Sequence, residues 1–131
     1  MRITHGTISG NTAVGGGGLV GATTTAALVL HNTIAAGNVA LEGEGSDLVG
    51  NAAAESATNL IGTEGDGGFV DGVGGNIVGV DWKTVLENDG INPVLKNNGG
   101  PTETIAVLVS STPARDAVDG GSVSSTNDEL Q

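Results

Sequence analysis

Six acidic residues in the middle of the chain are the side chains best suited to bind a metal ion. They are Glu42, Glu44, Asp47, Glu64, Asp66 and Asp71. Residues 42–49 approach the calcium-binding nonapeptide Gly-Gly-x-Gly-x-Asp-x-apolar-x, and oxygen ligands suit Ca²⁺. Such sites require tandem copies, whereas this chain has one. The pattern therefore favours an acidic loop that keeps the protein soluble, with a Ca²⁺ site as the alternative, and metal binding stays open.

The remaining residues with chemical potential favour structural roles. His5 and His31 lie 26 residues apart in similar surroundings, which predicts a polar ladder at a strand end, with a shared metal ion as the alternative. Residues 16–21 match the dinucleotide pattern Gly-x-Gly-x-x-Gly, but a strand-like sequence follows where a helix would be needed, so we expect a turn. Trp82 more often closes a core than stacks on a sugar. We expect no catalytic and no cofactor-binding residues.

An internal repeat indicates which elements position these residues. Residues 3–11 align with residues 29–38 at an offset of 26, which becomes 27 where Asn11 meets Asn38. The stretches 59–62 and 76–79, Asn-Leu-Ile-Gly and Asn-Ile-Val-Gly, continue the series. This period fits one turn of a solenoid. It predicts inward columns in which Ile3 lies over Val29 and Ile8 lies over Ile34.

The composition favours strands over helices. The chain has 24 Gly, one Trp, one Phe and no Cys, and its apolar residues stand in short runs between Gly and Asn. We expect an all-β protein, a right-handed parallel β-helix of about four to five coils. Asp89-Gly90 predicts a two-residue hairpin turn between 85–88 and 91–95, and residues 105–109 predict a last strand.

A family resemblance rests on residues 7–13, on the glycine run 15–18, on residues 32–38 and above all on residues 97–106, Asn-Asn-Gly-Gly-Pro-Thr-Glu-Thr-Ile-Ala. These segments resemble bacterial right-handed β-helix surface proteins with polymorphic outer-membrane protein repeats, which end in the choice-of-anchor Q region. The resemblance covers roughly residues 3–121 and corresponds to the C-terminal portion of such proteins. It implies export, display at the cell surface or secretion, and no assigned catalysis.

These expectations combine into one domain and one function. We expect residues 1–121 to form a single β-helix domain, a fragment of a longer chain, and residues 122–131 to form a flexible polar tail. We expect the function to be that of a non-enzymatic structural or adhesive module of a bacterial cell-surface or secreted protein, with a surface glycan or protein as its ligand. A polysaccharide lyase or hydrolase and a calcium-stabilised folding module are the alternatives.

The charge of the chain bears on its partners. The net charge of −11 argues against binding to nucleic acid or to an anionic membrane, because both need clustered Lys and Arg. No apolar segment is continuous enough to insert into a membrane, and no signal peptide is visible at the first residues. Unpaired strand edges at the exposed coil ends predict self-association.

Overall fold

The computed structural model describes residues 1–21, 28–43, 46–62 and 66–108, and in these it contains short strands and three single-turn 3-10 helices. The strands are β1 (Arg2–Thr4), β2 (Thr7–Ile8), β3 (Thr12–Ala13), β4 (Leu19–Val20), β5 (Val29–His31), β6 (Ile34–Ala35), β7 (Val39–Ala40), β8 (Leu48–Val49), β9 (Leu60–Ile61) and β10 (Ile77–Val78). The helices are η1 (Asp66–Gly68), η2 (Val73–Gly75) and η3 (Trp82–Thr84).

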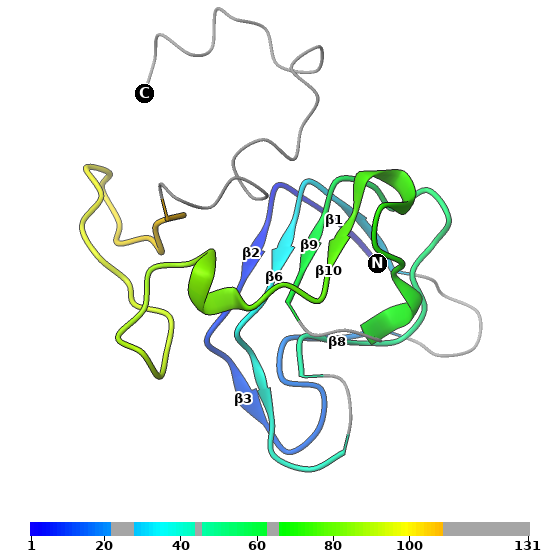
Figure 1. Ribbon diagram of the computed structural model, residues 1–131, viewed down its shortest axis with the longest axis horizontal. Helices are drawn as coiled ribbons and strands as arrows, with labels where there is room; N and C mark the ends of the chain where they lie inside the picture. Colours follow the sequence, from blue (N-terminus) through cyan, green and yellow to red (C-terminus); the bar gives the residue numbers. More distant parts are fainter. Residues whose placement is uncertain (22–27, 44–45, 63–65, 109–131) are drawn as a thin grey trace, which may run out of the picture.

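Each strand pairs in parallel with a strand from a distant part of the sequence. Strands β1 and β5, β3 and β7, and β4 and β8 form two-stranded sheets, and a four-stranded sheet has the order β10-β9-β6-β2. Figure 1 shows the four-stranded sheet as neighbouring arrows, with β3 on a projection below it. Paired residues are 27 apart in β1/β5, β2/β6 and β3/β7. The three successive strands β1, β2 and β3 therefore pair in order with the three successive strands β5, β6 and β7.

The strands are short because a left-handed bend follows many of them. His5 and Asn32 follow β1 and β5 with φ of 55° and 48°, and Gly10 and Gly37 follow β2 and β6 with φ of 73° and 74°. Glycine adopts this conformation freely, and asparagine tolerates it better than most residues. The bends therefore recur at equivalent places in residues 2–13 and in residues 29–40. This match keeps the paired strands in register.

The four-stranded sheet has a hydrophobic cluster on each face. Neighbouring strand residues point to opposite faces, so Ala35 and Ile61 lie on one face, and Ile34 and Leu60 lie on the other. The first cluster contains the buried residues Leu28, Leu30, Ala35, Leu48, Ile61 and Phe69. The second contains the buried residues Ala36, Leu60, Val85 and Leu86, with Ile34, Val80, Trp82 and Ile105 packed against them. The segment after β10 thus covers the outer face of the sheet.

The expected right-handed parallel β-helix of about four to five coils is wrong. The described residues form four small parallel sheets with two to four strands each, and they show no long closed solenoid. The spacing between paired residues falls from 26 in β6/β9 to 17 in β9/β10. The shortened last segment has too few residues to repeat the strands that pair in β3/β7 and β4/β8. After β10 the described chain adds no further parallel strand.

The expected side-chain columns are wrong by one residue. Ile3 pairs with Leu30 and Ile8 pairs with Ala35, whereas Val29 lies beside Arg2 and Ile34 lies beside Thr7. A slip of one residue exchanges the two faces of a strand, so the difference decides which residues enter the core. Leu30 and Ala35 are fully buried, while Ile34 is half-buried on the opposite face. The spacing of 27 that joins Asn11 to Asn38 holds in β1/β5, β2/β6 and β3/β7, and it becomes 29 in β4/β8.

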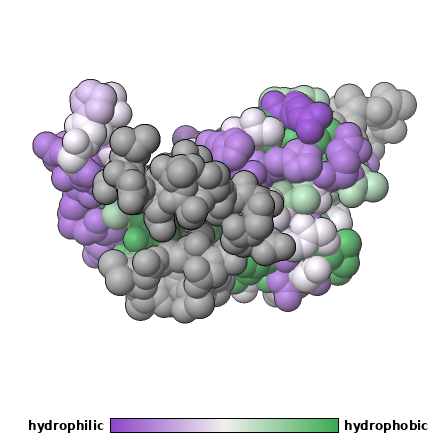
Figure 2. Space-filling view, turned by 90° about the horizontal axis from the view of Figure 1, so that it is seen from above, coloured by the Kyte–Doolittle hydropathy of each residue, from purple (hydrophilic) through white to green (hydrophobic). Residues whose placement is uncertain are grey.

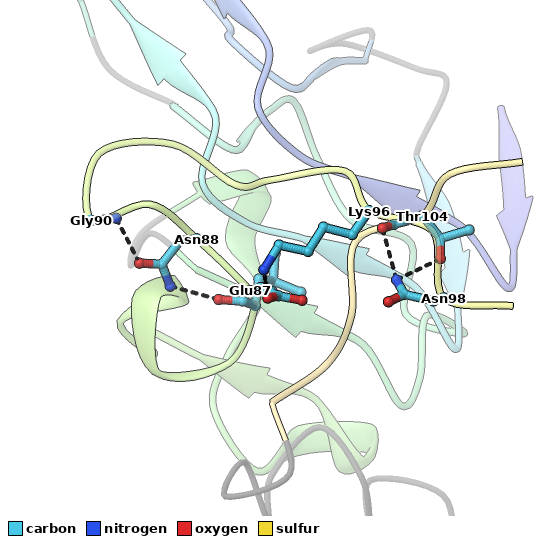
Figure 3. Close-up of polar contacts among 7 residues, drawn as sticks. Glu87, Asn88, Gly90, Lys96, Asn98 and Thr104 are labelled. Atoms are coloured by element: carbon cyan, nitrogen blue, oxygen red, sulfur yellow. Dashed lines mark hydrogen bonds and ion pairs between the residues drawn. The ribbon is translucent and has the colours of Figure 1, made fainter.

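The chain reverses direction near Asp89-Gly90, but the expected two-residue turn is not formed. Asn88 bridges Pro93 in an isolated antiparallel contact, which leaves a four-residue loop, and Asp89 N donates to Asn92 O at 3.1 Å. Figure 3 shows the polar contacts of this region, in which Lys96 pairs with Glu87 and Asn98 donates to Thr104.

The described residues end at residue 108, within the expected last strand. Residues 105–108 contribute one isolated antiparallel bridge, from Val107 to Leu86, in place of the expected strand. Residue 109, the rest of the domain predicted to end at residue 121 and the tail at residues 122–131 lie outside the described residues.

Candidate functional site

Three polar side chains form a hydrogen-bonded series beside the bends after β2 and β6, which we call the first polar column: Asn11, Asn38 and Asp47. Asn38 Oδ1 accepts the backbone N–H of Asn11 at 3.1 Å and its side-chain Nδ2 at 3.0 Å. Asp47 Oδ1 accepts the same two groups of Asn38, each at 2.9 Å. Asn38 and Asp47 are 5% and 1% exposed. Asn38 and Asp47 thus each supply the acceptor for the backbone N–H of the residue before them in the column.

A second polar column repeats this arrangement ahead of the four-stranded sheet, with Thr33, Asn59 and Asn76. Asn59 Oδ1 accepts the N–H of Thr33 at 3.0 Å, and Asn76 Oδ1 accepts the N–H of Asn59 at 3.1 Å and its Nδ2 at 2.9 Å. Asn59 Nδ2 also donates to Leu30 O at 2.8 Å. All three residues of this column are buried. A buried polar group without a partner is costly, so these amides fix the neighbouring segments at one register.

The bend after β1 and β5 carries a chain of surface contacts. Thr58 Oγ1 donates to Asn32 Oδ1, and Asn32 Nδ2 lies 3.2 Å from His5 Nε2. Because the Asn32 oxygen accepts from Thr58, its Nδ2 donates, and His5 Nε2 is the acceptor. All three residues have a positive φ, between 48° and 55°. Side-chain contacts thus join the bends at His5, Asn32 and Thr58 to one another.

The predicted ladder of His5 and His31 does not form. His5 corresponds to Asn32, and His31 pairs with Thr4 within the β1/β5 sheet. The His31 ring is half-buried, and its Nε2 is a buried atom without a hydrogen-bond partner. The match of two histidines at an offset of 26 was a coincidence of residue type. The described residues contain no group of three His, Asp or Glu that could hold a metal ion.

The candidate calcium ligands that the structure describes do not share one environment. Asp47 is buried and its Oδ1 bonds Asn38, so this carboxylate stabilises the fold. Glu42 is exposed beside the β3/β7 sheet. Asp71 accepts the N–H of Val78 at 3.0 Å. Asp66 begins η1, and Glu44 and Glu64 lie outside the described residues.

The Gly-x-Gly-x-x-Gly segment at residues 16–21 packs closely against another part of the backbone. Gly18 N donates to Ser46 O at 3.0 Å, and a Cβ on Gly18 would lie 2.4 Å from Asp47 O. A Cβ on Gly17 would lie 2.6 Å from Val39 O. The glycines therefore allow the chain to approach β7 and β8. The expected turn is not formed: residues 17 and 18 bend, and Leu19–Val20 form the strand β4.

Trp82 packs on the outer hydrophobic cluster. It is half-buried against that cluster, and a Cβ on Gly37 would lie 3.0 Å from its Cδ2. Lys83 Nζ lies 5.6 Å from the centre of the ring. Close by, an open pocket of about 230 Å³ is lined by Thr7, Leu95, Thr104 and Ile105. On the face seen in Figure 2, apolar residues outside the grey atoms stand in small groups among hydrophilic ones.

The carboxylate of Asp89 has a lowered pKa. The backbone N–H groups of Asn92 and Ile91 donate to Asp89 Oδ1 at 2.7 and 2.8 Å and lower the pKa of Asp89. These hydrogen bonds stabilise the charged form. Asp89 is fully exposed, so the effect concerns the local loop at residues 89–92.

The buried residues that join the segments were only partly visible in the sequence. The alignment had marked Asn59 and Asn76 as equivalent, and the register of β9 and β10 confirms it. The alignment does not identify Asn59, Asn76, Thr33 or Ser56 as buried. The available signal was an Asn that directly precedes each apolar pair, at 59–61 and 76–78.

Comparison with family models, with curated proteins and with solved structures gives no match for this chain. None of the helices in the described ranges has the length and apolar character needed to span a membrane.

Proposed function

We propose that the chain is a non-enzymatic structural or adhesive module of a bacterial cell-surface or secreted protein, with a surface glycan or protein as its ligand. The observation that carries the proposal is the use of the buried polar side chains. Asn38, Asp47, Asn59 and Asn76 bond the backbone or amide groups of neighbouring segments. A framework held in this way presents its surface loops in fixed positions.

The burial and the hydrogen bonds of these polar side chains fit a structural role in a surface-displayed module better than a catalytic role. Catalytic groups must meet substrate at a cleft, whereas Asp47 and Asn59 are 1% and 0% exposed and bond the fold itself. The resemblance of residues 7–13 and 97–106 to surface-displayed bacterial proteins supports the same proposal. Location at the cell surface and the absence of catalysis are parts of this proposal.

Turnover and binding assays test the proposal together. The purified chain is incubated with polygalacturonate and related acidic glycans, and unsaturated and reducing ends are measured. Binding to intact bacterial cells and to immobilised glycans is measured in parallel. We expect binding without product. Formation of unsaturated or reducing ends in proportion to the protein would overturn the proposal and favour a polysaccharide lyase or hydrolase.

A pair of variants shows whether binding depends on the fold. Asn59→Ala removes a buried amide, and Asn97→Ala removes an exposed one. If rigid display supports binding, Asn59→Ala weakens it and Asn97→Ala leaves it unchanged. Equal binding by Asn59→Ala and the wild-type chain, with Asn59→Ala measurably less stable, would contradict the role of the framework.

A further inference from the structure

Within the described residues, the first three strands present peptide groups without hydrogen-bond partners along one edge. We call this edge the N-terminal edge and define it as β1, β2 and β3. Gly6 O and Ile8 O accept from Ile34 and Ala36. In a parallel strand the peptide groups of alternate residues point to opposite sides, so the N–H and C=O of Thr7 point away from β6. The same reasoning applies to Thr4 in β1 and Thr12 in β3.

The opposite edge is closed by side chains. The N–H of Val78 in β10 points away from β9 and donates to Asp71 Oδ1 at 3.0 Å. The N–H of Ala40 in β7 points away from β3 and donates to Ser46 Oγ at 3.4 Å. Such groups block addition of a further strand. Within the described residues, no side chain caps the corresponding groups of Thr7 and Thr12.

The N-terminal edge also exposes part of the apolar interior. Ile3 and Ile8 are half-buried, while their partners Leu30 and Ala35 are fully buried. On the outer face, the column of Thr7, Ile34 and Leu60 ends at the pocket of about 230 Å³ lined by Leu95, Thr104 and Ile105. A strand added beside β2 would place one side chain toward this pocket and the next toward Ile8.

The charge distribution indicates which end of the molecule a second copy can approach. The chain carries −11 overall, yet residues 1–41 contain no Asp or Glu and one Arg, Arg2. Like charges repel within a Debye length of about 8–10 Å at physiological salt. Two copies therefore meet with the least repulsion through the segment that contains β1, β2 and β3.

We propose that the N-terminal edge binds the N-terminal edge of a second copy of this chain, in a closed two-fold dimer. Because the opposite edge is capped by Asp71 and Ser46, a head-to-tail series of copies is blocked. The two-fold arrangement pairs each edge with itself, with the strands antiparallel. The inference does not depend on the proposed surface function.

Analytical ultracentrifugation of the full chain tests the dimer. Over a concentration series, the wild-type chain should pass from monomer to dimer without larger species. Thr7→Lys places a charge on β2 at the pocket and should weaken the dimer roughly tenfold or more. Thr102→Lys adds the same charge at an exposed site outside the edge and should dimerise like the wild type.

Two further measurements keep the test decisive. Thr7→Pro removes the outward N–H of Thr7 without removing a bond to β6, so it should give a monomer. If that variant does not fold, concentration-dependent NMR shifts of the Arg2, Thr4 and Thr7 amides locate the contact in the wild-type chain. A wild-type chain that stays monomeric, a dimer unaffected by Thr7→Lys, or growth into larger species would overturn the proposal.

Discussion

Asp47 Oδ1 accepts both the backbone N–H and the side-chain Nδ2–H of Asn38, each over 2.9 Å, in a site where Asp47 is 1% exposed. Asn38 Oδ1 accepts the same two groups of Asn11, the backbone N–H and the side-chain Nδ2–H. The carboxylate oxygen of Asp47 therefore has the role toward Asn38 that the amide oxygen of Asn38 has toward Asn11. The residue that the sequence suggested as a calcium ligand thus ends a polar column.

Removing this carboxylate should destabilise the fold. Asp47→Ala leaves the N–H and Nδ2–H of Asn38 without their acceptor, which should cost about 2–3 kcal/mol of unfolding free energy. Asp47→Asn keeps an acceptor oxygen at this position, so its unfolding free energy should fall by less than that of Asp47→Ala. Urea denaturation measures both variants. Equal stability of Asp47→Ala and the wild type would show that the Asp47–Asn38 contact does not stabilise the fold.

Asn59 should be more important to stability than an exposed asparagine. Asn59→Ala removes the acceptor of the Thr33 N–H and the donor to Leu30 O, both in the interior, and should cost about 3 kcal/mol. Asn97→Ala removes an exposed contact with Gly99 N and should change stability by less than about 1 kcal/mol. Thermal unfolding compares them, and similar losses in the two variants would contradict the second polar column.

Sequence reasoning located the repeat but not its geometry. The offset of 27 at Asn11 and Asn38 was visible, and the structure applies it to β1, β2 and β3 together. The register was wrong because matching His5 with His31 gave an offset of 26. Residue identity had guided that alignment, whereas hydrogen bonding of the buried amides and the burial of Leu30 set the actual register.

The site was harder to predict than the repeat. The acidic pattern at residues 42–49 gives the types of the ligands but not their exposure, and burial turns Asp47 into a structural acceptor. The expected fold failed at the last segment, where a spacing of 17 replaces 26. The shorter step from Asn59 to Asn76 is visible in the sequence, but the sequence does not show that η1 and η2 lie between these two stretches where further parallel strands were expected.

Glycine 18 should not tolerate a side chain. In Gly18→Ala the Cβ would lie 2.4 Å from Asp47 O, a backbone atom that cannot move without disturbing the β4/β8 sheet, and the cost should be about 1–3 kcal/mol. The matched variant Gly15→Ala places its Cβ 3.8 Å from Glu42 O, an ordinary contact, and should change stability by less than about 0.5 kcal/mol. Denaturation curves that coincide for the two variants would refute close packing at Gly18.

The loop at residues 89–92 should loosen in acid. The pKa of Asp89 is lowered by the N–H groups of Asn92 and Ile91, so the contribution of these bonds is present above the ordinary Asp pKa. It is lost as the pH falls through the lowered value. A carboxyl NMR titration should therefore give Asp89 a pKa below that of an unstructured peptide. A value at or above the peptide reference would contradict the two hydrogen bonds.

Hydrogen exchange at the Thr33 amide tests most directly whether buried amides hold the segments together. Thr33 is 1% exposed and its N–H donates to Asn59 Oδ1 at 3.0 Å. We expect slow exchange of this amide in the wild-type chain. In Asn59→Ala its exchange should accelerate more than that of the Lys96 amide, which bonds Thr104 O. Exchange of the wild-type Thr33 amide at the rate of an unprotected peptide would show that the buried amides do not hold the paired strands together.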